Sequence, residues 1–246
     1  MSFAPSPQET AVDASPAVRS ALAVLDAAAA LRPAVFSTSF GAEDMVVLDL
    51  IRRHGLAIDI FTLDTGRLPE ETYALMQQVE ARYGRCVRTL FPDAQAVEAL
   101  VARDGINGFR DSVAQRKACC AVRKLEPLGR ALAGQRAWVT GLRAGQSAAR
   151  AQLAARETDS ARAIEKFNPL HDWSQAQVWD YLRALAVPYN ALHDRYYPSI
   201  GCAPCTRAIS AGEDPRAGRW WWENEQAKEC GLHPVRLVQP SVRESA

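Results

Sequence analysis

Four cysteines of this chain fall into two closely spaced pairs, a pattern that is typical of metal sites. Cys119 and Cys120 are adjacent, and Cys202 and Cys205 form a C-x-x-C motif more than eighty residues later. Neighbouring side chains on a helix point about 100° apart, so the adjacent pair would crowd one zinc ion but could reach two irons of a cluster. We therefore favour an iron–sulfur cage over a four-cysteine zinc site, with disulfides as a third alternative.

A fifth cysteine, Cys230, stands apart near the C-terminus and is a candidate nucleophile. Gly231 follows it directly and His233 lies three residues further on. A reactive cysteine needs exposure and electropositive surroundings that lower its pKa. Lys228 and His233 could supply positive charge, whereas Glu229 works against it. Taken alone, a cysteine in a tail is more often incidental than catalytic.

The composition of the chain limits the classes of protein to which it can belong. The chain has 246 residues, of which 48% are hydrophobic and 23% charged, as in soluble globular proteins that contain one large domain or one domain plus a tail. The formal net charge is only +1, so neither nucleic acid nor a membrane is indicated as a partner, and any anion site must be local. The first 16 residues lack the features of a signal peptide. We expect a cytoplasmic protein with reduced thiols.

Short apolar strands alternate with amphipathic helices, and this alternation predicts an α/β fold: a mostly parallel sheet with helices on both faces. A loose arm is expected over 1–14, and little is periodic after residue 188. We expect a nucleotide- and cluster-binding domain over 1–205 and a tail over 206–246. Strands are expected at 34–38, 58–63, 86–91, 137–140 and 163–167, and helices at 16–31, 45–54, 69–83, 94–103, from Ser112 through both adjacent cysteines, and from Ser174.

Polar and glycine-bearing segments follow three of these strands, at 37–44, 64–67 and 141–150. Ligands bind beyond the carboxyl ends of parallel strands, so these segments predict one site at one edge of the sheet. The first segment offers hydroxyl groups and a helix N-terminus, which favour an anion, although a well-capped helix would look the same. Glu43 and Asp44 fit that alternative, because acids stabilise a first helical turn.

Arginines concentrate on the loops around this expected site, and their forked side chains match phosphate and sulfate oxygens. Lys124, one turn after Cys120, could offset the charge of a thiolate-bound cluster or be merely exposed. The three tryptophans at 220–222 are expected to pack the tail onto the domain. The arginines are Arg143 and Arg150 after the fourth strand, and Arg207, Arg216 and Arg219 after the C-x-x-C motif.

In their joint order, these motifs resemble the assimilatory sulfonucleotide reductases over about residues 35–233. The resemblance implies the fold of the adenine nucleotide α-hydrolases. The four paired cysteines resemble the branch that carries a 4Fe–4S cluster and reduces adenylyl sulfate, since the branch using the 3′-phosphorylated nucleotide usually lacks them. The motifs are SFGAEDMV at 39–46, LDTGR at 63–67, Cys119-Cys120, GCAPCTR at 201–207, GRWWWE at 218–223 and ECGLH at 229–233.

The resemblance also implies a mechanism and a set of site residues. The Cys230 thiolate would attack the sulfur of adenylyl sulfate and expel AMP, and thioredoxin or a similar dithiol would then release sulfite from the S-sulfonate. His233 would position the tail or the substrate, and Lys124 would couple the cluster to the substrate. The implied cluster ligands are Cys119, Cys120, Cys202 and Cys205. The implied substrate-binding residues are Ser37, Ser39, Gly41, Leu63, Asp64, Gly66, Gly141, Arg143, Arg150, Arg216 and Arg219.

Two other functions compete with this one. The first is a reductase of 3′-phosphoadenylyl sulfate, and the second is an iron–sulfur or zinc sensor that binds a nucleotide without turnover. Cys230 favours the enzymes over the sensor, because a sensor has no need of a nucleophile in a tail. The sequence leaves open the reductant and the oligomeric state, a homo-oligomer included.

Overall fold

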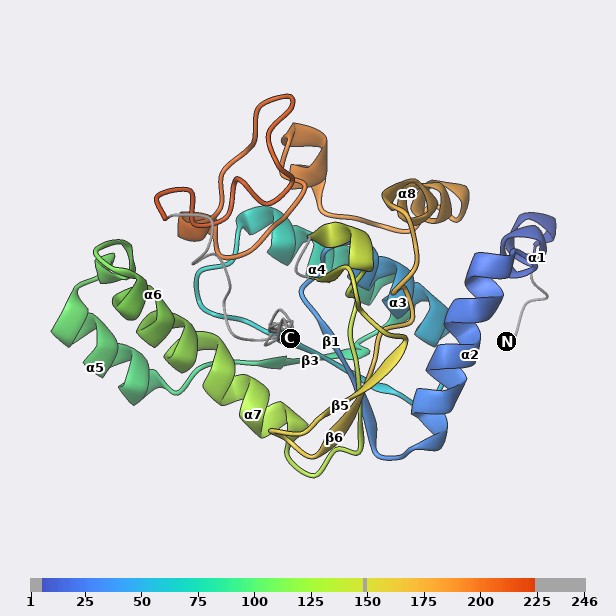
Figure 1. Ribbon diagram of the computed structural model, residues 1–246, viewed down its shortest axis with the longest axis horizontal. Coiled ribbons are helices and arrows are strands. Elements are labelled where there is room, and N and C mark those ends of the chain that lie inside the picture. The colour runs from blue at the N-terminus through green and yellow to red at the C-terminus, as the bar shows by residue number, and fades with distance from the viewer. Residues whose placement is uncertain (1–5, 148–149, 224–246) are drawn as a thin grey trace, which may run out of the picture.

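A six-stranded sheet lies at the centre of the computed structural model, which describes residues 6–147 and 150–223 (Figure 1). The strand order is β3-β2-β1-β4-β6-β5, and only β5 runs antiparallel to its neighbour. The expected mostly parallel sheet is therefore confirmed. The strands are β1 (Ala34–Thr38), β2 (Asp59–Leu63), β3 (Val87–Leu90), β4 (Ala137–Val139), β5 (Arg156–Asp159) and β6 (Ile164–Phe167).

Successive strands are added first on one side of β1 and then on its other side. From β1 the chain proceeds to β2 and β3 on one side, whereas β4 pairs with the other side of β1 and leads to β6. In the shared register, Phe36 of β1 lies opposite Ile60 and Val139. The connections that follow β1 and β4 run in opposite directions along the sheet. They therefore leave a crevice at the carboxyl ends of these two strands, where such folds bind ligands.

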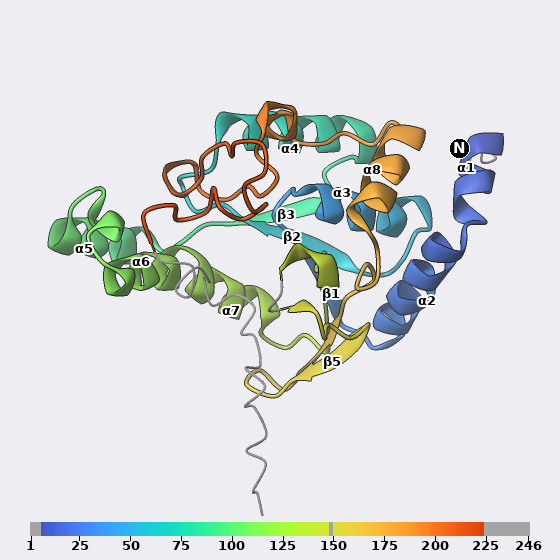
Figure 2. The same ribbon diagram turned by 45° about the horizontal axis from the view of Figure 1, so that its top comes forward.

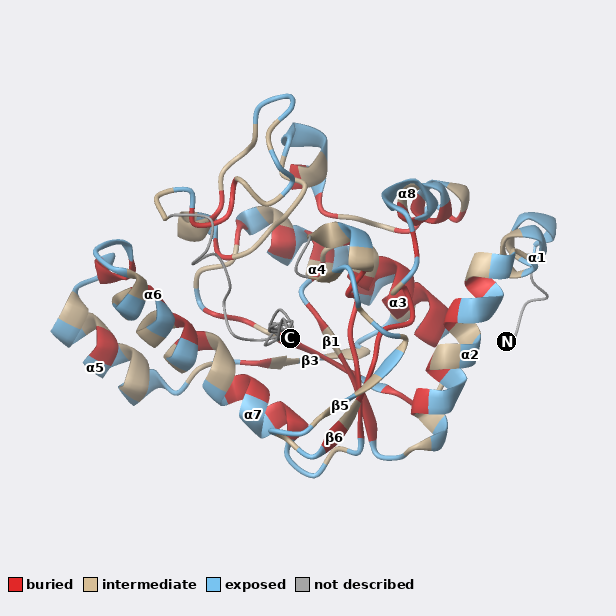
Figure 3. Cartoon of the chain, in the orientation of Figure 1, coloured by how far each residue is buried: buried red, intermediate tan, exposed pale blue. Residues whose placement is uncertain are grey.

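Helices cover both faces of the sheet (Figures 2 and 3). Successive strand residues point to opposite faces, so Phe36 packs in the core beneath α2, α3, α4 and α8, while Val35 and Trp138 pack against α7. None of the described helices has the length and apolar character needed to cross a membrane. The helices are α1 (Pro7–Asp13), α2 (Pro16–Ala30), α3 (Ala42–Arg53), α4 (Glu70–Tyr83), α5 (Ala94–Asp104), α6 (Val113–Cys120), α7 (Glu126–Leu132) and α8 (Gln175–Ala184).

The adjacent cysteines lie at the end of α6, within the long helical stretch that the sequence predicts. Ser112 caps α6, because its hydroxyl accepts a hydrogen bond of 3.1 Å from the Gln115 amide. After Cys120 the helix widens into a π-helical turn, Ala121–Leu125, and then continues as α7. Such turns within helices are frequent at functional sites.

The prediction of a loose arm over 1–14 is wrong for the described residues of this segment, because Pro7–Asp13 form α1. The missed signal is a capping box: the Ser6 hydroxyl accepts from the Glu9 amide at 3.2 Å, and the Glu9 carboxylate accepts from the Ser6 amide at 2.7 Å. Pro7 at the first helical position fits the same motif.

The edge strand β5 was not expected, because its sequence, RETD, has no apolar alternation. Polar pairs across the strands hold it to β6: Lys166 donates to Glu157 at 2.8 Å, and Glu165 accepts from Arg156 at 2.7 Å. Cross-strand ion pairs of this kind contribute modestly to sheet stability. The predicted fifth strand at 163–167 corresponds to β6.

A buried carboxylate joins four helices on the face away from α7. Asp49 of α3 is fully buried and accepts hydrogen bonds from Arg53 Nε at 2.9 Å, Tyr83 OH at 2.7 Å and Tyr181 OH at 2.6 Å. Arg53 in turn binds Asp13 of α1 at 2.6 Å. Burial raises the pKa of both tyrosines, and the charge of Asp49 raises it further. The hydroxyls therefore remain donors.

Removing this carboxylate should be strongly destabilising. Asp49→Ala leaves two buried hydroxyls without their acceptor and removes one of the two carboxylates that pair with Arg53, so we expect a loss of about 3–5 kcal/mol in the free energy of unfolding. Asp49→Asn retains an acceptor oxygen and should lose less. The exposed Asp59→Ala is the matched control. Urea unfolding measures all three, and a loss for Asp49→Ala no larger than that of the control would contradict the assignment.

Candidate active site

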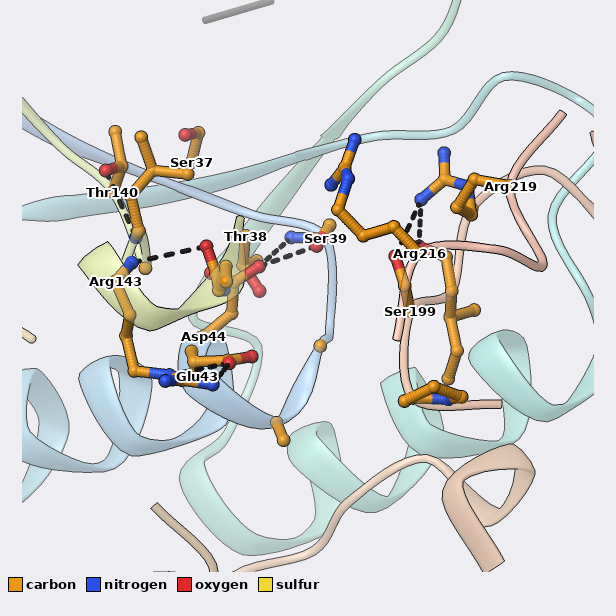
Figure 4. Close-up of a pocket in the computed structure, with 18 of the residues that line it drawn as sticks. Ser37, Thr38, Ser39, Glu43, Asp44, Thr140, Arg143, Ser199, Arg216 and Arg219 are labelled. Atoms are coloured by element: carbon orange, nitrogen blue, oxygen red, sulfur yellow. Dashed lines mark hydrogen bonds and ion pairs between the residues drawn. The ribbon is translucent and has the colours of Figure 1, made fainter. Parts of the chain in front are cut away.

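A cavity of about 290 Å³ opens at the carboxyl ends of β1, β2 and β4, in the predicted crevice (Figure 4). Figure 4 shows Ser39, Asp44 and Arg143 on one side and Ser199, Arg216 and Arg219 on the other. Eleven of the predicted residues line it together: Ser37, Ser39, Gly41, Leu63, Gly141, Arg143, Arg150, Arg216, Arg219, Lys124 and Cys202.

The turn between β1 and α3 is organised by Asp44. The Ser39 amide and hydroxyl both donate to the Asp44 carboxylate, at 2.5 Å and 2.7 Å. Asp44 is buried, and this burial raises its pKa to about 6, although the Ser39 bonds lower it. The sequence suggested only that the Asp44 charge stabilises the first turn of the helix. In the structure, the Asp44 carboxylate also holds the turn through its hydrogen bonds with Ser39.

Gly141, directly after Thr140, lies against the same carboxylate. A Cβ atom built on Gly141 would lie 2.1 Å from Asp44 Oδ1, a separation that no side chain tolerates. The loop after β4 therefore approaches the turn after β1 closely only because residue 141 is glycine. The two loops form one continuous wall of the cavity.

The arginines of the cavity have two different roles. Arg143 is buried and already engaged: Nη2 lies 2.8 Å from Glu43 Oε1, and Nη1 donates to the Trp173 carbonyl at 3.2 Å. Arg219 donates to the Ile200 carbonyl at 3.1 Å and lies 4.8 Å from the Trp220 ring centroid. Arg143 thus fixes the loop after β4 to α3, while Arg219 is held against the far wall.

Two predicted contact residues, Asp64 and Gly66, do not line the cavity. Asp64 accepts hydrogen bonds from the Gly66 amide at 2.8 Å and from Tyr73 OH at 2.9 Å. Gly66 has a φ of +70°, which favours glycine. Both residues shape the turn after β2, and a direct contact with substrate stays a prediction for them.

The four paired cysteines line a second, smaller cavity beside the first. Positively charged side chains surround them, and no carboxylate of the described residues belongs to the lining. Within 6–147 and 150–223, no three His, Cys, Asp or Glu side chains are placed to hold a single metal ion. The donor set of this cavity is four thiols among positively charged side chains. The lining residues are Cys119, Cys120, Cys202, Cys205, Arg67, Phe109, Arg116, Arg123, Lys124, Pro204 and Trp220.

The thiols of this cavity differ in their readiness to ionise. Burial tends to raise the pKa of Cys202, but Lys124, a contact of 3.3 Å with Thr65 Oγ1, and nearby arginines outweigh it and leave the pKa below its usual value. Burial, reinforced by the charge of Cys202, raises the pKa of Cys205 to about 12.

The two cavities share a wall. Lys124, Cys202 and Trp220 line both of them, so the expected coupling residue Lys124 lies between the cysteines and the predicted anion site. Trp220 is buried, which confirms the expected packing for this tryptophan, whereas Trp221 is exposed.

Comparisons with known proteins agree with this arrangement. A phosphoadenosine phosphosulfate reductase domain matches residues 33–208. The chain belongs to this family. Proteins named adenosine 5′-phosphosulfate reductase are similar to it: that of Allochromatium vinosum is 63% identical over 85% of this chain and 82% of the relative, and that of Burkholderia cepacia is 53% identical over 82% and 81%. The predicted family is confirmed.

Solved structures agree with the fold. The phosphoadenylyl-sulfate reductase of Candida auris, in complex with phosphate, has a TM-score of 0.66 and 29% identity over 85% of this chain and all of that one. Yeast FAD synthetase, at 13% identity over 84% and 70%, has a TM-score of 0.51 and shows the fold alone. The expected adenine nucleotide-binding α/β fold is therefore confirmed.

Sequence reasoning missed two arginines of this reductase-family chain. Arg116 precedes Cys120 by four residues, and Arg123 follows Cys119 by four. Helical spacing places such residues on the same face, and this signal could have found them. Arg123 is buried and donates to the Thr65 carbonyl at 2.7 Å. The predicted Cys230 and His233 lie outside the described residues.

The raised pKa of Asp44 predicts a dependence of stability on pH. Because its folded-state pKa, about 6, exceeds the ordinary 3.8, Asp44 stabilises the fold below pH 4, and this contribution is lost as pH rises through 6. Between pH 5 and pH 7 the wild type should lose about 1 kcal/mol relative to Asp44→Asn, whose amide oxygen still accepts from Ser39. Urea unfolding at both pH values measures the difference. Parallel pH profiles would contradict the shift.

Proposed function

We propose that the protein reduces adenylyl sulfate to sulfite and AMP, with Cys230 as the nucleophile. The family supports a sulfonucleotide as substrate, and the relatives named adenosine 5′-phosphosulfate reductase favour the form without a 3′-phosphate. The structural observation that carries the proposal is the wall shared by an arginine-rich cavity and a four-cysteine cavity. A nucleotide sensor would not require this proximity.

The reaction proceeds in two steps. The Cys230 thiolate attacks the sulfur of adenylyl sulfate, so that an S–S bond forms, the sulfur–oxygen bond to the phosphate breaks, and AMP leaves. One thiol of a protein dithiol, thioredoxin or a similar protein, then attacks Cys230. Sulfite leaves with the electron pair of the S–S bond, and a mixed disulfide forms between Cys230 and the dithiol protein. The second thiol then attacks this mixed disulfide, which closes a disulfide on the dithiol protein and releases the Cys230 thiolate. The dithiol thus supplies two electrons, and the protein is unchanged.

The residues of the larger cavity bind and orient this substrate. Both its phosphate and its sulfate carry negative charge, and Arg150, Arg216 and Arg219 surround the space available to them. Positive side chains aimed at oxygens that gain charge as AMP departs lower the barrier. The Ser39 amide is held by Asp44, but the first turn of α3, which begins at Ala42 beside it, supplies N–H groups that suit the same anion. His233 completes the site by positioning the tail.

A 4Fe–4S cluster held by Cys119, Cys120, Cys202 and Cys205 is the proposed cofactor. The positive charges of the lining support this, because a cluster with four thiolate ligands carries net negative charge. When bound, it supplies electrostatic and structural support without a required change of redox state. Lys124, in the shared wall, neutralises charge on the thiolates and on the substrate sulfate at once.

The tail that bears Cys230 has to serve two partners. The thiolate must reach the sulfur inside a closed site, and the S-sulfonate must then be presented to a separate protein. A lid-like exchange of the tail accounts for both requirements. The substrate and the reductant are those of the reducing cytoplasm, where we place the protein.

The covalent step has a distinctive stoichiometry. Protein mixed with adenylyl sulfate and no reductant should release about one AMP per active site and gain the mass of one sulfonate group on Cys230. Cys230→Ser should bind AMP but give neither product. Chromatography and intact mass measure both. An adduct on Cys86, or preferential reaction of the 3′-phosphorylated nucleotide, would overturn the proposal.

The cofactor is tested by metal analysis and by a cysteine comparison. Anaerobically purified protein should contain iron and inorganic sulfide and absorb broadly near 400 nm, on the order of what cuboidal clusters show. Cys119→Ser and Cys202→Ser should lose iron and sulfide, while Cys86→Ser, outside the cysteine cavity, should retain them. Stoichiometric zinc without sulfide would refute the cluster.

A further inference from the structure

The guanidinium group of Arg219 lies against the backbone that leads into the C-x-x-C motif (Figure 4). Its Nη1 donates to the Ile200 carbonyl at 3.1 Å and to the Ser199 hydroxyl at 3.4 Å. Gly201 follows, and a Cβ atom built on it would lie 2.3 Å from Arg219 Nη2 and 2.5 Å from Cζ. The guanidinium group therefore occupies the space that a side chain at position 201 would fill.

The indole ring of Trp220 lies beside the same guanidinium group. Its centroid is 4.8 Å from Arg219 Cζ, a distance at which an arginine is attracted to the face of the ring. Trp220 has a φ of +43°, a backbone conformation that bulky residues rarely adopt. Its amide donates to the Cys205 carbonyl at 3.1 Å, so the C-x-x-C motif helps to set the ring in place.

Thr206, directly after the motif, ties the cysteine loop to the segment that bears Arg219. Its hydroxyl accepts from the Gly201 amide at 3.2 Å and donates to the Cys202 carbonyl at 3.0 Å. Its backbone also forms an antiparallel bridge with Arg219. Gly201 and Arg219 are thus held in register by the loop that carries two of the four paired cysteines.

We propose that Gly201 is a positioning residue for the substrate anion: because it lacks a side chain, it admits the Arg219 guanidinium to the wall of the larger cavity. Both residues line that cavity. Since Gly201 directly precedes Cys202, the loop that supplies cysteines to the second cavity also sets where this positive charge of the first cavity lies. The proposal rests on the proposed function in one respect, the choice of adenylyl sulfate as the ligand.

Gly201→Ala tests this role without a large disturbance of the fold. The added methyl group would meet the end of a flexible side chain, which can move aside, and the φ of Gly201 lies outside the left-handed region. The matched control is Gly129→Ala in α7, where an added Cβ atom would point into open space.

The experiment is a double-mutant cycle that combines Gly201→Ala with Arg219→Ala. The affinity of the anaerobically purified protein for adenylyl sulfate is measured by calorimetry, in a Cys230→Ser background that prevents sulfonate transfer during the titration. The contents of metal and sulfide show whether the cysteine site is intact. A direct clash between the new methyl group and the substrate would persist in the Arg219→Ala background, whereas an effect exerted through the guanidinium group would vanish there.

Gly201→Ala should weaken adenylyl sulfate binding about tenfold, because a displaced guanidinium group loses its charged hydrogen bonds to the anion. Gly129→Ala should stay within about twofold of the parent protein. In the Arg219→Ala background, Gly201→Ala should weaken binding by less than about twofold further.

Three results would overturn the proposal: an equal loss of affinity in both backgrounds, an affinity that either single substitution leaves unchanged, or loss of the bound metal in Gly201→Ala. The proposed function fails separately, if the protein with Cys230 intact forms no adduct on that residue. The binding cycle requires no turnover, so it still decides the role of Gly201 in that case.

Discussion

The larger cavity depends on one close approach, that of the Asp44 carboxylate to two loops at once. Ser39 donates two hydrogen bonds to Asp44, and Gly141 packs against its other oxygen without room for a Cβ atom. The carboxyl ends of β1 and β4 are thereby fixed relative to α3, and the crevice between them acquires a defined shape. Burial of the Asp44 carboxylate disfavours its charged form, and the raised pKa of Asp44 reflects this desolvation.

The chain is nearly neutral overall, yet the cysteine cavity is surrounded by positive charge because several arginines line it. Arg143 is balanced by Glu43 and Arg116 by Glu223, both in desolvated pairs, and these pairs hold structure together. Arg123 donates to a backbone carbonyl and faces the cysteines. The charge of Arg123 is therefore directed toward the thiols of the cysteine cavity. Net charge therefore says little about such a site.

The sequence predicted the parallel strands, most helices and several of the residues that line the larger cavity, because each depends on local pattern or on the rule that sites follow strand ends. It did not predict β5, whose stability comes from cross-strand ion pairs formed only after folding. It also missed Arg116, whose importance depends on Glu223 more than a hundred residues away. Asp64 was placed in the cavity because it follows a strand, yet its hydrogen bonds turn it into the adjacent loop.

The π-helical turn after Cys120 sets the phase of everything that follows on that helix. A π turn contains about one residue more than an α-helical turn, so it rotates the next segment by about 100°. Cys119 and Arg123 line the cysteine cavity, whereas Leu128 and Leu132 of α7 pack in the core against the sheet. One continuous helical segment therefore covers the hydrophobic core at one end and lines a polar site at the other, and the extra residue of the π turn lies at the boundary between the two.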